Sequence, residues 1–238
     1  MADYRFNPDA TAPITATAAA EQVTAFLRKV YGWMFVGLGI TAVVAYLVVS
    51  SPALVRTIAS NQILFLVLIL AELGLVFYLS ARATSLAPNT AAGLFVVYSA
   101  LNGVTLSLIL LMYTGASIAT TFMITAGMFG AMALFGSTTK RSLAGFGQFL
   151  MMGLIGLILA SIVGIFWHSE ALQFLISVVG VVVFTGLTAW DAQRLKVIAL
   201  SIPGGQLGSY AIVGALSLYL NFINLFLILL RFQGSSRD

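Results

Sequence analysis

Long apolar runs separated by short polar breaks occupy most of the chain. Each run is close to the roughly 20 residues that one helical membrane crossing needs. The runs lack the alternation of a barrel wall, and backbone in lipid has to be hydrogen-bonded within its own segment. The pattern therefore predicts an all-α integral membrane protein, a bundle of seven transmembrane helices. The predicted spans are about 31–49, 62–80, 91–111, 118–135, 146–167, 171–189 and 210–230.

The tails and the segment before the first span complete the predicted organisation. We expect a flexible N-terminal tail over 1–20, a membrane domain over 21–232 and a short C-terminal tail over 233–238. The N-terminal tail has no continuous apolar stretch, so we do not expect a signal peptide. Apolar residues recur at helical spacing within 21–31, which predicts a short helix along the cytoplasmic interface.

The distribution of Lys and Arg predicts the orientation of the bundle. With the N-terminus inside, eight basic residues are cytoplasmic and three lie on the opposite side. This asymmetry favours a cytoplasmic N-terminus and an external C-terminus. The eight are Arg5, Arg28, Lys29, Arg82, Lys140, Arg141, Arg194 and Lys196; the three are Arg56, Arg231 and Arg237.

Composition narrows the function classes. The chain is 61% hydrophobic and 8% charged, whereas soluble domains are about a quarter charged. It has no Cys and a single His, His168, which excludes disulfides and thiolate zinc sites, and we expect no cofactor. The net charge of +4 is scattered, so we expect no nucleic-acid partner.

Small residues also recur at helix-contact spacing. Gly156, Ala160 and Gly164 lie four residues apart in the fifth span, and Ala126 and Gly130 do so in the fourth. Such stripes let helices approach closely in lipid. We expect them to be packing seams inside one bundle and the protein to be a monomer, with dimerisation as the lesser alternative.

Polar residues inside the spans cluster on single helix faces, which indicates that these faces look inward. In the seventh span the face carries Tyr210, Gly214, Ser217, Asn221, Asn224 and Arg231. In the sixth it carries Ser177, Phe184, Thr188 and Asp191, and in the third Tyr98, Asn102 and Thr105.

Two carboxylates stand out within these spans. Glu72 lies near the middle of the second span, where an ionised carboxylate costs at least about 2.5 kcal/mol, so it has to be protonated, paired or hydrated. We expect partners among Arg231, Asn102 and the amides of the seventh span, either as a structural hydrogen bond or as a functional group. Asp191 is followed by Arg194 and Lys196. It is interpreted either as half of a local ion pair or as a gate reached by water from the cytoplasm.

Four stretches of the chain resemble the bacterial branch of the Bax inhibitor-1 (transmembrane BAX inhibitor motif) family. They are YGWM at 31–34, AGMFGAMALFGSTTKRSLAGFG at 126–147, GLTAWDAQRLK at 186–196 and GALSLYLNFINLFLILLRF at 214–232. The resemblance implies seven helices with one at the centre, and a pH-sensitive calcium leak. It also implies a location in the bacterial cytoplasmic (inner) membrane. It also implies a sensor of two aspartates from the sixth and seventh helices, latched by an arginine of the second.

Carried onto this chain, the resemblance makes Asp191 the first sensor residue, Arg82 the latch, and Glu72 with Arg231 a buried pair. The second sensor position is Asn221, an amide where the family usually has an acid. Two close carboxylates repel and share protons, so the amide removes that repulsion and halves the formal charge offered to a cation. We therefore expect a weak calcium site at Asp191 with Asn221, and a pH response displaced from that of a two-acid sensor.

Other classes fit less well. A retinal protein needs a lysine in the seventh span, and an intramembrane aspartyl protease needs a second membrane Asp. His168 lies in a predicted turn, where a serine protease could not use it. We therefore expect no enzyme. A membrane adaptor that binds other membrane proteins, such as a quality-control protease, and conducts nothing is the alternative. We see no inverted repeat to support a proton-coupled transporter.

Overall fold

The computed structural model describes residues 16–82, 85–167, 169–201 and 207–235. Those residues form α1 (Ala16–Val49), α2 (Pro52–Ser60), α3 (Gln62–Ala81), α4 (Pro88–Leu111), α5 (Gly115–Thr138), α6 (Ala144–Phe166), α7 (Glu170–Ser201) and α8 (Leu207–Gln233). Every one of these except α2 is long and apolar enough to cross a membrane, which makes seven spans. The predicted all-helical membrane architecture is confirmed. His168, most of the N-terminal tail and the last three residues lie outside the described residues.

The polar breaks supply the caps that start several helices. The side chain of Ser51 accepts a hydrogen bond from the backbone of Leu54 at the start of α2, where Pro52 occupies the first turn. Asn61 caps α3, and Thr114 caps α5 in the same way. These side-chain oxygens satisfy backbone N–H groups that a helix start leaves unpaired. The nine-residue helix α2 was not predicted, because it is too short to form an apolar run.

Helix α1 differs from its prediction. A separate interfacial helix over 21–31 is wrong: residues 16–49 form one continuous helix of 34 residues. No proline or polar break interrupts this stretch, so the helix continues and already includes residues 16–20, which were assigned to the tail. Phe26 and Val30 are buried in the main core cluster. Their apolar face therefore packs against protein rather than along the membrane surface.

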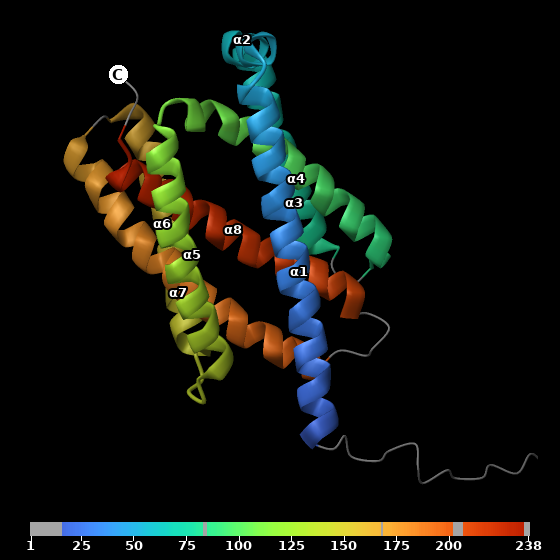
Figure 1. Cartoon of the computed structure of the whole chain (residues 1–238). Helices are drawn as coiled ribbons and strands as arrows, with labels where there is room; N and C mark the ends of the chain where they lie inside the picture. The colour runs from blue at the N-terminus through green and yellow to red at the C-terminus, as the bar shows by residue number, and fades with distance from the viewer. Residues whose placement is uncertain (1–15, 83–84, 168, 202–206, 236–238) are drawn as a thin grey trace, which may run out of the picture.

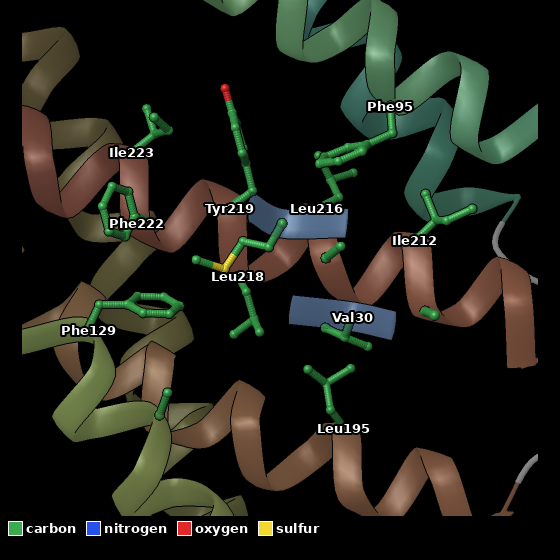
Figure 2. Close-up of a cluster of buried hydrophobic side chains, with 14 of the residues drawn as sticks. Val30, Phe95, Phe129, Leu195, Ile212, Leu216, Leu218, Tyr219, Phe222 and Ile223 are labelled. Carbon is green, nitrogen blue, oxygen red and sulfur yellow. The ribbon is translucent and has the colours of Figure 1, made fainter. Parts of the chain in front are cut away.

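Helix α8 is the most buried of the seven spans and runs through the middle of the bundle in Figure 1. It packs against α1, α4, α5 and α7. Figure 2 shows its side chains meeting Val30 of α1, Phe95 of α4, Phe129 of α5 and Leu195 of α7. A helix that is apolar around most of its surface is stable only when surrounded, which explains the central position.

Helices α3 and α6 lie at the periphery. Helix α3 packs chiefly on α4, and α6 packs chiefly on α7. Both expose rows of large apolar side chains, as expected for surfaces that face lipid. These side chains include Leu66, Leu70 and Phe77 on α3, and Phe149, Met152 and Ile155 on α6. Because neither helix covers α8 fully, one face of the central helix remains only half-buried.

The small-residue stripes form the expected seams only in part. Gly164 of α6 is buried, and a Cβ on it would lie 3.5 Å from the Gln173 side chain of α7. At Gly130 and Gly156 no neighbouring helix comes within 4 Å of the position that a Cβ would occupy. Close crossings are made by other glycines instead. A Cβ on Gly136 of α5 would lie 2.0 Å from the carbonyl oxygen of Ala189 in α7, and one on Gly147 of α6 would overlap the Trp190 indole. Spacing alone did not reveal which glycines face a partner.

Candidate cation site on the central helix

The candidate site is built where α7 crosses α8. Ser217 and Asn221 lie four residues apart on α8, so their side chains project from the same face. The Ser217 hydroxyl donates to Oδ2 of Asp191 at 2.7 Å, and Nδ2 of Asn221 donates to the same oxygen at 2.8 Å. Asp191 and Asn221 are each only 6% exposed. The structure thus brings together the two predicted sensor positions.

The hydrogen bonds at this site use the side-chain N–H and O–H donors, whereas several side-chain oxygens accept no hydrogen bond from described residues. Both bonds to Asp191 end on Oδ2, and Oδ1 accepts none from any described residue. Nδ2 of Asn221 is used on Asp191, and Nδ2 of Asn224 donates to the Leu220 carbonyl. Flipping either amide would set its oxygen against another oxygen, so the assignment follows from the contacts. The oxygens left over, one of them on a carboxylate, suit a cation or another donor.

Three cavities follow the half-buried face of α8. The largest, about 560 Å³, contains Asp191, Ser217, Asn221 and Asn224 in its wall and reaches Glu72. A second, about 240 Å³, shares Asp191 and Ser217 and extends toward the N-terminal end of α8. A third, about 350 Å³, shares Asn224 and ends at Arg231. The polar face predicted for the seventh span is therefore the floor of a row of cavities.

The basic residues close to Asp191 in sequence are engaged elsewhere. Arg194 is exposed and lies over the indole of Trp190, with its guanidinium carbon 5.4 Å from the ring centroid. Lys196 donates to the carbonyl of Ser137 at the C-terminal end of α5, where a cation complements the helix dipole. Within the described chain neither forms an ion pair with Asp191. The local ion-pair interpretation of Asp191 is not what the structure shows.

Helix α7 is longer than its predicted span and holds the connection between α5 and α6. It continues to Ser201, so Asp191 lies well inside a helix. Gln193 accepts a hydrogen bond from the backbone of Leu143 at 2.7 Å and donates to the carbonyl of Arg141 at 2.8 Å. Sequence reasoning missed this residue, although a glutamine between a buried Asp and two cations was a visible signal.

Glu72 lies in a second polar cluster, formed by α3, α4 and α8. Thr105 donates to Oε1 of Glu72, and Nδ2 of Asn102 donates to Oε2 at 3.2 Å. The Tyr219 hydroxyl donates to Oδ1 of Asn102 at 3.0 Å and lies 2.6 Å from the Thr41 hydroxyl. The predicted contact between Glu72 and Asn102 is present. Both Glu72 oxygens are occupied by protein donors.

Several other predicted members of the buried network lie apart from it. Arg231 is exposed and donates to Gln173 at 3.4 Å, so the structure does not pair it with Glu72. Tyr219, which donates to Glu72's partner Asn102, and Arg231 are separated by about three helical turns along α8. The Thr188 hydroxyl bonds within its own helix, to the carbonyl of Phe184.

Arg82 is found at the end of α3 rather than at Asp191. It is the C-cap residue, and its backbone N–H donates to the Tyr78 carbonyl. Its side chain is exposed and makes no ion pair with Asp191 in the described part of the chain. Ser80, two residues earlier, nevertheless lines the cavity that contains Asp191. Arg82 itself does not line that cavity.

The site offers little to a tightly bound metal. No group of three or more His, Cys, Asp and Glu side chains lies close enough to hold a metal ion within the described residues. Asp191 and Asn221 supply one formal negative charge and two oxygens that accept no hydrogen bond from the described residues. Ca²⁺ prefers six to eight oxygen ligands including several carboxylates. The chemistry therefore suits a transient, largely hydrated cation rather than a resident one.

Six spans around a buried seventh, with a carboxylate held by that central helix, define an integral membrane protein. Residues 23–238 match the family described as "Inhibitor of apoptosis-promoting Bax1", and the chain belongs to this Bax inhibitor-1 family. It is 50% identical to the inner membrane protein YbhL of Escherichia coli K12 over 89% of this chain and 92% of that protein. An uncharacterized protein of Borreliella burgdorferi is 46% identical over 90% and 93%, and one of Caulobacter vibrioides 43% over 98% and 99%. The predicted family and inner-membrane location are confirmed.

Proposed function

We propose that the protein is a pH-dependent cation leak channel, with calcium among its ions, and that the Asp191 carboxylate is its gate. One observation carries the proposal. A carboxylate that is 6% exposed keeps one oxygen that accepts no hydrogen bond from the described residues, and it lies in the wall of two cavities that share lining residues. A carboxylate in this position is costly, which a purely structural role would offset by bonding both oxygens.

The cavities follow α8, one of the helices long and apolar enough to cross a membrane. Their floor runs along α8 from Tyr210 to Arg231, a rise of about 30 Å at 1.5 Å per residue. This is close to the roughly 30 Å thickness of the hydrocarbon core. Ser217, Asn221 and Asn224 place polar oxygens at intervals between the two ends. A hydrated cation crossing along α8 would therefore meet polar groups at successive turns, with the carboxylate near the middle.

Protonation supplies the pH dependence. A proton on the Oδ1 oxygen would neutralise the charge that attracts a cation, so protons and cations compete for the same atom. Movement of the cytoplasmic end of α3 would carry Arg82 toward Asp191, because Ser80 already lines that cavity. An Arg82 guanidinium at Asp191 would close the path by occupying the carboxylate.

We further propose that the N-terminus is cytoplasmic. Because seven spans connect them, the two ends of the membrane domain lie on opposite sides. Arg82, Arg141, Arg194 and Lys196 belong to the end of the bundle at which α1 starts, and Arg56 and Arg231 to the other. The positive-inside tendency favours the richer end as cytoplasmic.

The proposal is tested by ion flux through the purified protein in liposomes, with calcium loaded inside and a fluorescent indicator outside. The wild type should release calcium at a rate that depends on pH, and Asp191→Asn should reduce release to the level of empty liposomes. Circular dichroism and gel filtration would confirm that the variant is folded. A folded wild type that is silent from acidic to alkaline pH, yet copurifies with another membrane protein, would favour the adaptor role instead.

A further inference from the structure

The largest cavity opens sideways, between α3 and α6. Residues of both helices line it and are also exposed on the outer surface: Leu73 is 51% exposed, Met151 41% and Ile158 52%. These side chains belong to the apolar surfaces that face lipid. The cavity is therefore reachable from the lipid phase as well as along α8.

The lining of this cavity has two chemically different parts. Toward the mouth it consists of aliphatic side chains of α3, α6 and α8, such as Ile69, Leu154 and Leu227. At its inner wall lie the oxygens that accept no hydrogen bond from described residues, on Asp191 and Asn221. A ligand that matches both parts has an alkyl chain and a head group rich in donors, preferably carrying a positive charge.

We infer that this cavity binds a long-chain primary ammonium compound taken from the lipid phase, with the ammonium on Oδ1 of Asp191 and the alkyl chain between α3 and α6. The ammonium has three N–H donors, which would be shared between the carboxylate oxygen of Asp191 and the side-chain amide oxygen of Asn221. The volume of about 560 Å³ is within the range of small-molecule sites.

The charged and titratable groups around the cavity favour a cation over an anion. Its lining contains Glu72 from α3, Tyr98 from α4, and Asp191 and Arg194 from α7; the residues that α6 and α8 contribute to it carry no titratable side chain. Arg194 is exposed at the rim and engaged on Trp190. An anionic head group at the inner wall would meet two acids there.

The alkyl chain and the head group contribute differently. Moving an alkyl chain from lipid into an apolar protein cavity gains little, because lipid tails are as apolar as leucine. The discrimination between ligands of equal chain length should therefore come from the ammonium on the carboxylate. An alcohol of the same length tests this, since it offers a donor without the charge.

Trp190 in the cavity wall provides a readout that needs no ion flux, so the inference can fail or succeed independently of the proposed channel. We suggest the double variant Trp33→Phe, Trp167→Phe, which leaves Trp190 as the sole tryptophan, in phosphatidylcholine vesicles. Quenching of Trp190 by a bromine-bearing dodecylamine is compared with quenching by the equally brominated dodecanol. Bromine quenches only at close contact, so saturable quenching reports occupation of the cavity.

In this background the amine should quench saturably and with a half-saturating concentration roughly tenfold below that of the alcohol, as expected for a charged hydrogen bond. Asp191→Asn should remove this difference. Glu170→Gln is the control and should keep it, because Glu170 lies in the first turn of the same helix and does not line the cavity. Equal quenching by amine and alcohol without any further substitution overturns the inference, as does an Asp191→Asn protein that keeps the preference. Loss of the preference in both carboxylate variants would do so too.

Discussion

The two carboxylates inside the bundle have opposite surroundings. Glu72 lies on the peripheral helix α3 and is half-buried, and each of its oxygens accepts a hydrogen bond from α4. Asp191 lies deep in α7, and its two hydrogen bonds from α8 converge on a single oxygen. Both residues line the same cavity. Burial alone therefore does not distinguish the two carboxylates. Asp191 can bind a ligand because one of its oxygens accepts no hydrogen bond from the described residues, whereas the Glu72 hydrogen bonds join two helices.

The difference also concerns how tightly each neighbourhood is packed. Beside Asp191, α5 approaches α7 so closely that Gly136 has no room for a side chain. Near Glu72, Gly74 of α3 has open space around it. The Asp191 site is thus held by a rigid crossing of helices, and the Glu72 cluster is held mainly by its hydrogen bonds.

The largest expected effect is on flux when the free oxygen is removed. Asp191→Asn should lower cation flux at least roughly tenfold, because an interaction between a charged acceptor and a donor is worth about 1.5 kcal/mol or more. Glu72→Gln should stay within about twofold of the wild type, since each Glu72 oxygen already accepts a hydrogen bond from α4. Flux in proteoliposomes measures both. Equal losses in the two variants would remove the distinction between the carboxylates.

The packing difference predicts a matched pair of glycine substitutions. Gly136→Ala places a methyl group 2.0 Å from the Ala189 carbonyl oxygen, and backbone cannot yield as a side chain does. The expected destabilisation is about 1–3 kcal/mol, seen as a lower thermal midpoint in detergent. Gly74→Ala meets open space and should be neutral or slightly stabilising. An unchanged thermal midpoint for Gly136→Ala would show that α5 and α7 pack less closely than these contacts indicate.

Restoring a second acid should change how the site responds to pH. Asn221→Asp puts two carboxylates at hydrogen-bonding distance, where they repel and share a proton, so the pH midpoint of flux should move by about one unit or more. The matched control is Asn224→Asp, one turn along the same face, whose amide bonds Leu220 and not Asp191. Calcium release recorded over a pH series distinguishes the two. Identical midpoints for wild type and Asn221→Asp would contradict the proposed role of Asp191.

The smallest effect on flux is expected when only one of the two hydrogen bonds from α8 to Asp191 is removed. Ser217→Ala leaves Asn221 on the same oxygen, so flux should change by no more than about threefold and the thermal midpoint should fall slightly. Ser177→Ala, whose hydroxyl bonds only the Gln173 carbonyl of its own helix, is the control. A Ser217→Ala effect as large as that of Asp191→Asn would mean that Oδ2, and not Oδ1, is the atom that matters.

The partners of the buried polar groups could be predicted only in part. Helical phase placed Ser217 and Asn221 on one face, and family resemblance set Asn221 opposite Asp191; the structure joins all three. The same reasoning paired Glu72 with Arg231, which lie apart, because phase says which face a residue occupies but not how far a neighbouring helix is displaced along it. For the same reason the sequence could not place Arg82, which caps α3 and forms no ion pair with Asp191 among the described residues.

The membrane class, the seven spans and most helix ends could be predicted from the sequence. Apolar run length and capping residues set these features, and each depends only on residues within one segment of the chain. The sequence also determined the family. The tertiary structure alone decided which glycines make close crossings, which oxygen of Asp191 remains unused, and that α3 and α6 leave a face of α8 uncovered. These features depend on the distances and angles between helices that are far apart in the chain, and local propensity carries no information about them.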